Sequence, residues 1–268
     1  MRKNNIKKAL FALIFLIGYS VQSQVLIALL LGDKLNSGKV EFGLDGGVNF
    51  ATVGNMDSDN WTRNYNLGFY FDIRMKEQWY LNTGVLVKST LGIGKLTEED
   101  LEFLEATTYG TDGEYKQRMS YFLVPVLAKY RFKNNIYTEL GPQFGLLHKS
   151  HVEFISEVDG NSAKIKENNI EKMNRFDMGM AAGVGYRLLK GLGWTIGIRY
   201  YYGFLDVYKD RSGTNNSSLF LKVNIPFGIS QEKKDKIQEV KEMNREAKAK
   251  RKEAKKAEKK NKKSPEEE

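Results

Sequence analysis

The sequence contains no cysteine, and it has only 4 prolines and 2 histidines among its 268 residues. The lack of cysteine excludes a disulfide framework and a thiolate metal site. The sequence also has no run of 18 or more apolar residues, which excludes a bundle of membrane-spanning helices. Glycine (25), tyrosine (14) and phenylalanine (15) are abundant instead. This composition favours β structure that is rich in aromatic residues.

The net charge of +9 is concentrated at the two ends of the chain. Residues 1–23 hold four basic residues and no acidic residue, and residues 231–268 hold 15 basic and 10 acidic residues. Residues 24–230 hold 23 of each and are neutral. A basic face for nucleic acid is therefore not expected on the folded body.

The first 23 residues have the features of a secretory signal peptide. A basic segment is followed by an apolar core over residues 9–18, and small or permissive residues precede Gln24. This pattern predicts cleavage before Gln24. The alternative is an uncleaved anchor over residues 9–31, but the polar residues 19–24 interrupt it.

Alternation of apolar and polar residues dominates from residue 39 to residue 229. Such alternation puts successive side chains on opposite faces of a strand. Near the end of the body, for example, Ile198 and Tyr200 share one face and Arg199 lies on the other. Eight strands are predicted, over residues 39–53, 63–75, 79–93, 118–132, 136–149, 173–188, 194–207 and 217–229.

By the same parity, thirteen ionisable residues of both signs lie opposite the apolar stripe. They are Glu41, Asp45, Asp72, Arg74, Lys88, Lys129, Arg131, Glu139, Arg175, Asp177, Arg187, Arg199 and Lys222. Thr90 is placed on this polar face, and Leu91 on the apolar face. Ionisable groups in a confined interior are costly unless they are paired or hydrated. We therefore expect a network of opposite charges to close the interior.

The connections between the predicted strands alternate strictly between long and short, at 9, 3, 24, 3, 23, 5 and 9 residues. An up-and-down barrel in an outer membrane has short periplasmic turns, longer external loops and an apolar outer face. A soluble lipocalin-like barrel is the alternative. The membrane is favoured because the strands exceed the ~9–11 residues needed to cross it, and because aromatic residues gather at the short turns. This expected girdle consists of Trp79, Tyr130, Phe132, Tyr186, Trp194 and Phe227.

Four stretches of the body resemble the PorT-like family of outer-membrane β-barrel proteins. They are Gly32 to Gly43, Tyr121 to Phe132 (YFLVPVLAKYRF), Tyr137 to Leu147 (YTELGPQFGLL) and Arg175 to Leu188 (RFDMGMAAGVGYRL). The resemblance covers residues 32–229. It implies an eight-stranded barrel in a Gram-negative outer membrane, in a family whose namesake is linked to type nine secretion. Most members have no assigned biochemical activity.

The predicted fold class is thus all-β, an eight-stranded antiparallel up-and-down transmembrane β-barrel over residues 39–229, with both termini in the periplasm. A short periplasmic segment, residues 24–38, precedes it, and the apolar run Val25 to Leu31 has no assignment. The tail, residues 230–268, is rich in lysine, glutamate and alanine and is expected to be helical or disordered. A short helix is also considered in the acidic loop stretch Glu98 to Thr107.

Catalytic chemistry has one candidate cluster, in which His148, Ser150, His151 and Glu153 supply the residue types of a lipid hydrolase. Their spacing fixes no geometry, and they are expected to be exposed loop residues. The glycines of Gly179 to Gly185 alternate as a strand, so close packing in a narrow barrel explains them better than a phosphate loop. No catalytic, cofactor-binding or metal-binding residue is therefore assigned, and no cofactor is expected.

The function expected from the sequence is that of a non-enzymatic outer-membrane barrel, a structural, docking or secretion-accessory component with a lumen filled by side chains. The alternatives are a lipid-modifying hydrolase of the outer membrane and a narrow small-solute pore. Expected partners are outer-membrane lipid, a secretion or envelope complex, and a periplasmic protein or cell-wall polymer that contacts the tail.

Overall fold

The computed structural model describes residues 39–158, 161–227 and 231–261. The predicted signal peptide, the segment 24–38 and the run from Val25 to Leu31 lie outside the described residues. Within the described part, no helix is both long enough and apolar enough to cross a membrane.

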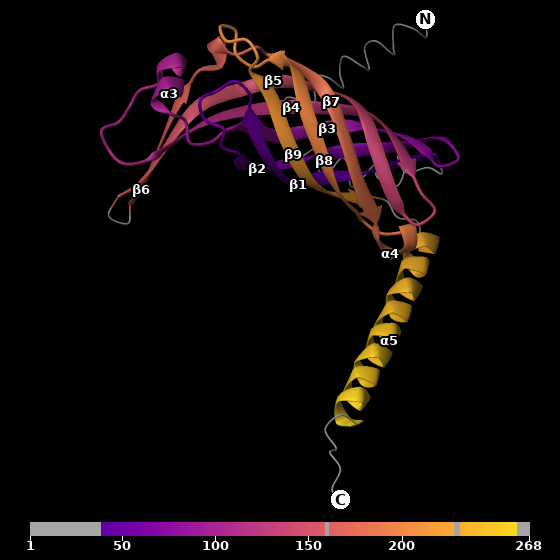
Figure 1. Cartoon of the computed structure of the whole chain (residues 1–268). Helices are drawn as coiled ribbons and strands as arrows, with labels where there is room; N and C mark the ends of the chain where they lie inside the picture. The colour runs from indigo at the N-terminus through magenta and orange to yellow at the C-terminus, as the bar shows by residue number, and fades with distance from the viewer. Residues whose placement is uncertain (1–38, 159–160, 228–230, 262–268) are drawn as a thin grey trace, which may run out of the picture.

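Among the described residues, eight antiparallel strands form a closed ring (Figure 1). They are β1 (Val40–Val53), β2 (Thr62–Lys76), β3 (Trp79–Ile93), β4 (Glu114–Arg131), β5 (Ile136–Val158), β7 (Phe176–Arg187), β8 (Thr195–Asp206) and β9 (Asn215–Pro226). Each strand of the ring pairs with the next one, and β9 pairs with β1 to close it. This confirms the predicted eight-stranded up-and-down topology.

The two faces of the wall follow the predicted alternation. In β8, Ile198 is 48% exposed on the outside, whereas its neighbour Arg199 is 2% exposed on the inside. Such exposure of large apolar side chains is expected for a wall that faces lipid. Trp79 and Trp194, at the short-turn end of the ring, are about half exposed, and Trp79 packs edge-on against Tyr130 at 4.9 Å. The expected girdle is therefore present at this end.

One strand departs from the predicted parity. The pairing of β3 with β4 shifts register between Leu86 and Ser89, and such a bulge moves the following side chains to the opposite face. Leu91 is consequently buried inside the ring and Lys88 is exposed. The predicted faces of Lys88, Thr90 and Leu91 are therefore wrong.

Two more of the thirteen ionisable residues are not enclosed. Arg74 is exposed at the end of β2, where its Nε donates to the Glu77 carbonyl at 3.1 Å. Arg175 is exposed just before β7. The alternation predicts on which face of the wall a side chain lies. It does not predict whether a residue at the end of a strand is enclosed by the ring.

The predicted loop 150–172 is mostly β structure. Strand β5 continues to Val158 and pairs there with β6 (Asn161–Asn168). The 3₁₀ helix η1 (Ile170–Lys172) then leads to β7. Because β4 begins at Glu114, earlier than predicted, it accompanies this hairpin. We call the resulting three-stranded extension of the wall, residues 114–120, 149–158 and 161–168, the flap.

Three α-helices complete the described structure. Helix α3 (Glu98–Leu104) lies in the longest connection, as considered from the sequence, and Thr97 and Asp100 form a capping box at its start. Helix α4 (Leu188–Gly191) lies in a short connection. Helix α5 (Gln231–Asn261) makes the described part of the tail helical, and it projects from the end of the ring where α4 lies (Figure 1).

Candidate functional site

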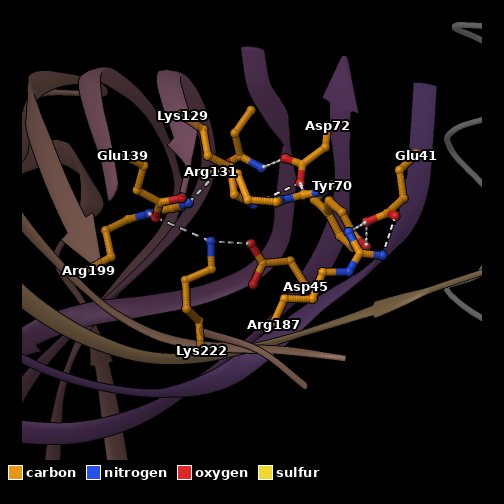
Figure 2. A network of polar contacts seen from close by, with 11 residues as sticks. Glu41, Asp45, Tyr70, Asp72, Lys129, Arg131, Glu139, Arg187, Arg199 and Lys222 are labelled. Atoms are coloured by element: carbon orange, nitrogen blue, oxygen red, sulfur yellow. Dashed lines mark hydrogen bonds and ion pairs between the residues drawn. The ribbon is translucent and has the colours of Figure 1, made fainter. Parts of the chain in front are cut away.

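The lumen at the short-turn end contains a network of buried ion pairs (Figure 2). Asp72 and Lys129, both at most 2% exposed, lie with Nζ 2.8 Å from Oδ2. Arg131 approaches the same oxygen at 3.3 Å, and the Asn82 amide donates to the other oxygen at 2.7 Å. Every oxygen of this carboxylate therefore has a donor, which a buried charge requires.

A second cluster shares Asn82 with the first. The Arg199 Nε donates to Glu139 Oε1 at 2.7 Å, and another nitrogen of the same guanidinium donates to Asn82 Oδ1 at 3.0 Å. Lys222 lies between two carboxylates, 3.4 Å from Glu139 and 3.6 Å from Asp45. The shared amide joins the two clusters into one network.

The third cluster lies closest to the short turns. Arg187 holds Glu41 with two nitrogens, and the Tyr70 hydroxyl donates to the same carboxylate at 3.1 Å. Together the three clusters take at least one residue from each of the eight strands of the ring. Figure 2 shows these side chains pointing toward one another across the lumen. The predicted charge network is confirmed, and it cross-links the whole circumference.

Glycines on the inner face provide the space for these large side chains. A Cβ at Gly183 would lie 2.9 Å from Glu139 Oε1, and Cβ atoms at Gly185 and Gly197 would collide with the Tyr137 ring and hydroxyl. The expected role of the 179–185 glycines in close packing is confirmed.

The lumen at the long-loop end is filled mainly by apolar side chains, which the sequence pattern did not indicate. Leu91, Met119 and Leu123 are fully buried and belong to one cluster with Tyr208. Leu91, Met119 and Leu123 come from the inner faces of β3 and β4, where the bulge and an imperfect alternation obscure the pattern. We call this set of residues the apolar cluster; its buried members are Ala51, Val53, Leu86, Leu91, Ile93, Leu96, Leu101, Leu104, Met119, Tyr121, Leu123, Leu127, Leu147, Val152, Met173, Ala181, Tyr201, Val207, Tyr208 and Phe220.

Helix α3 covers the apolar cluster. Leu101 and Leu104 are buried in the cluster, and the fully buried Asp100 accepts hydrogen bonds from the backbone N–H groups of Asp57 and Ser58 at 2.9 and 3.0 Å. These bonds tie the start of the helix to the β1–β2 loop. The helix therefore closes the long-loop end of the lumen rather than standing free in solvent.

Several buried polar atoms of the lumen have no hydrogen-bond partner within the described protein. Both amide atoms of Gln143 and of Asn224 are in this group, together with Asp177 Oδ1. The other oxygen of Asp177 accepts from the Asn216 amide at 2.8 Å. Buried groups of this kind are normally satisfied by internal water.

The histidine cluster considered for catalysis lies in strand β5 rather than in a loop, which corrects that expectation. Ser150 is buried, and its hydroxyl donates to Asn169 at 2.8 Å. His151, the next residue of the strand, lies on the opposite face near Glu153 at 3.9 Å, and His148 stacks on Phe122. The described geometry therefore brings no histidine to Ser150, and these residues do not form a hydrolase triad.

A pocket of about 350 Å³ opens at the long-loop rim. Its apolar base includes Leu104 and Val152, and Glu105, Glu167 and Lys172 stand around it. The Lys172 ammonium is held by Glu105 at 2.8 Å. Glu167 accepts hydrogen bonds from the Thr107 N–H and the Tyr109 hydroxyl, so these three charged groups are already engaged within the protein.

The sequence from residue 22 to residue 209, more than half of the chain, matches the family model of the outer membrane protein beta-barrel domain. The chain belongs to this family. The barrel is accordingly located in the outer membrane. The match is to the barrel domain as a whole and does not single out the PorT-like branch. No curated protein sequence matches the chain significantly.

Solved outer-membrane proteins resemble the barrel at low identity. Ail, the attachment invasion locus protein of Yersinia pestis, is 14% identical with a TM-score of 0.37, over 70% of this chain and 99% of Ail. Neisserial surface protein A is 11% identical with a TM-score of 0.35, over 70% and 97%. OprG from Pseudomonas aeruginosa is 12% identical with a TM-score of 0.33, over 70% and 93%. No function is transferred from them.

Proposed function

We propose that this protein is a non-enzymatic scaffold of the outer membrane that presents a charged helix to the periplasm. Two features support this function together. The lumen is braced by a polar network that takes side chains from all eight strands and is covered by α3, and a 31-residue helix leaves the opposite end. A filled barrel with an extended appendage is suited to anchoring and docking rather than to bulk transport.

The lengths of the connections support the proposed orientation. In outer-membrane barrels the short turns lie on the periplasmic side and the long loops outside. Strand β1 begins and strand β9 ends at the short-turn end, so α5 would extend into the periplasm. If straight, 31 helical residues span about 46 Å. The helix would thus reach well beyond the membrane surface.

The contact made by α5 is proposed to be electrostatic. Residues 231–268 carry 15 basic and 10 acidic residues, and Val240 is the only buried residue among the described side chains of the helix. Its partner would be an anionic cell-wall polymer or a periplasmic protein of a secretion or envelope complex. Exposed charges are screened over ~8 Å at physiological ionic strength, so the contact should weaken as salt rises.

Copurification tests this function. Full-length protein and a variant lacking residues 231–268 are extracted in mild detergent at low and high salt, and bound protein and cell-wall material are identified by mass spectrometry. We expect specific material with the full-length protein only, lost at high salt. Both forms should show the same heat-modifiable migration, because the ring ends at Pro226. Identical, salt-insensitive recovery with both forms would contradict a docking role for the helix.

A narrow small-solute pore is the second candidate, and the unpartnered amides of Gln143 and Asn224 favour it. Such groups mark hydrated positions inside the lumen. Planar-bilayer recordings separate the two candidates. The scaffold predicts no large, stable ohmic conductance, whereas a reproducible conductance that falls with added solute would establish the pore.

A further inference from the structure

The two faces of the flap are built differently, and one of them is already covered. On the covered face the Tyr109 and Tyr115 rings pack on Phe154 at 4.9 and 4.6 Å. Glu167 on the same face accepts from the Thr107 N–H and the Tyr109 hydroxyl, both at 2.9 Å. The loop between α3 and β4 thus occupies this face. Strand pairing places the charged residues considered below on the other face, which continues the outer wall of the ring.

The outer face of the flap gathers cations around one carboxylate. Glu153 is contacted by Arg118 at 2.7 Å, by Lys164 at 2.7 Å and by Lys166 at 3.9 Å. The Glu153 side chain is only 1% exposed, whereas those of Lys164 and Lys166 are 49% and 55% exposed. The carboxylate therefore lies beneath a layer of cationic groups that reach the surface.

This cluster carries more positive charge than its carboxylate neutralises. Three permanent cations face one carboxylate, and Lys116, directly opposite Glu153 in the sheet, is paired with Glu114 at 2.9 Å. The pKa of His151 is lowered by burial and then by the charge of Lys166, against the opposing effect of Glu153. The excess of cations around one carboxylate indicates a positive site with capacity for an added anion.

The cluster begins where the apolar outer face ends. Along β5 the outward side chains change from Leu146, which is 53% exposed, to the exposed Lys149. Along β4 they change from Phe122 to Arg118, and His148 stacks on Phe122 at this boundary, 4.5 Å between ring centres. Basic residues at the edge of a lipid-facing band lie at the level of lipid headgroups.

We propose that the outer face of the flap binds the phosphate groups of a phosphorylated glycolipid in the adjoining leaflet. The cations extend from Lys149 to the level of Glu153, four residues or ~13 Å along the strand. A phosphorylated sugar headgroup matches this depth better than the single phosphate of a glycerophospholipid. Arginine and lysine donate charge-assisted hydrogen bonds to phosphate oxygens. Only the choice of leaflet rests on the proposed orientation of the barrel.

Native mass spectrometry of the full-length protein in a neutral detergent tests the site. The probes are bisphosphorylated lipid A, the same lipid without phosphates, phosphatidylglycerol and inorganic phosphate. The double variant Lys164→Gln/Lys166→Gln is compared with Lys76→Gln/Lys133→Gln, which removes the same charge from exposed positions at the short-turn end. We expect binding of bisphosphorylated lipid A, weakened at least about tenfold in the flap variant, because even one lost charge-assisted hydrogen bond has an effect of this size. The control variant should bind like the unmodified protein.

A third variant, Glu153→Gln, distinguishes binding from support of the fold. It removes the competing carboxylate while keeping a hydrogen-bond acceptor, so lipid binding should become several-fold tighter. Unchanged heat-modifiable migration shows that each variant is folded. The proposal is overturned by equal weakening in the control, by equal binding of the phosphate-free lipid or of phosphatidylglycerol, or by full competition from millimolar inorganic phosphate. These outcomes do not depend on whether a partner copurifies through α5. Either proposal can therefore be contradicted while the other stands.

Discussion

The two halves of the lumen lie within one continuous wall but differ in the side chains that predominate in each. At the short-turn end, charged groups such as Arg199 and Glu139 pair across the interior. At the long-loop end, Leu91, Leu123 and their neighbours pack beneath α3. In both halves, alternate residues of each strand point into the interior. The alternation along a barrel strand therefore determines which side chains point into the lumen. Whether those side chains are charged or apolar is determined separately at each height along the barrel.

The two halves should also respond differently to substitution. A buried ion pair adds little net stability, but removal of one partner leaves an uncompensated charge in a low-dielectric interior. An apolar side chain loses transfer free energy and leaves a cavity. Paired substitutions should therefore recover stability in the charged half and accumulate losses in the apolar half.

The largest effect is expected from Arg199→Met in the charged half. The substitution removes the Arg199 nitrogens that donate to Glu139 at 2.7 Å and to Asn82 Oδ1 at 3.0 Å. We expect the free energy of unfolding to fall by ~3–5 kcal/mol, as when one partner of a buried pair is removed. Urea titration of protein refolded in lipid vesicles measures it. The double variant Glu139→Gln/Arg199→Met should recover part of this loss, and a double variant as unstable as the sum of its single changes would contradict the pairing.

In the apolar half, Leu123→Ala tests packing alone. Leu123 is fully buried, and a buried leucine cut to alanine typically costs ~2–5 kcal/mol. The matched control is Leu140→Ala, because Leu140 is 57% exposed on the outer wall and lipid chains can fill the space. The same urea titration should show a clearly smaller loss for the control. Equal losses would mean that Leu123 does not lie in a packed interior.

A charge on the outer wall tests the face assignment on which the comparison depends. Ile198→Arg places a cation near the middle of β8, where midplane arginines on barrel exteriors cost ~2–4 kcal/mol. Ser212→Arg adds the same charge in the exposed β8–β9 loop and should change stability little. Similar unfolding free energies for the two variants would show that Ile198 does not face lipid.

The sequence predicted the fold closely because the alternation and the lengths of the connections are both local signals. It placed Ile198 outside and Arg199 inside, and it identified the charged residues that pair in the lumen. It could not indicate which charges pair, because partners such as Glu41 and Arg187 are 146 residues apart. It also missed the apolar cluster, since the bulge between Leu86 and Ser89 reverses the parity of β3 ahead of Leu91, which belongs to that cluster.

The flap was missed for a different reason. Its strand β6 has only eight residues and carries Lys164, Lys166 and Glu167, a composition that is typical of a loop. These residues form a strand because they pair with the extension of β5. The cations meet around Glu153 only after this pairing, so the spacing of the residues gives no signal of a shared site.

The smallest effect concerns pH and the flap, which extends the wall beyond the long-loop end of the membrane-spanning ring. Burial alone would raise the pKa of Glu153, but the hydrogen bond from Lys164 and the charge of Arg118 outweigh it and lower the pKa below its usual value. A carboxylate with a lowered pKa in the folded state stabilises the fold above its unfolded pKa of ~4.3, and this stabilisation is lost as pH falls through the folded value. Hydrogen exchange, corrected for intrinsic rates, should therefore show protection of residues 149–158 falling at acidic pH while the ring stays protected. In Glu153→Gln the flap should show no such pH dependence, and an identical acid response in both proteins would place the titrating group elsewhere.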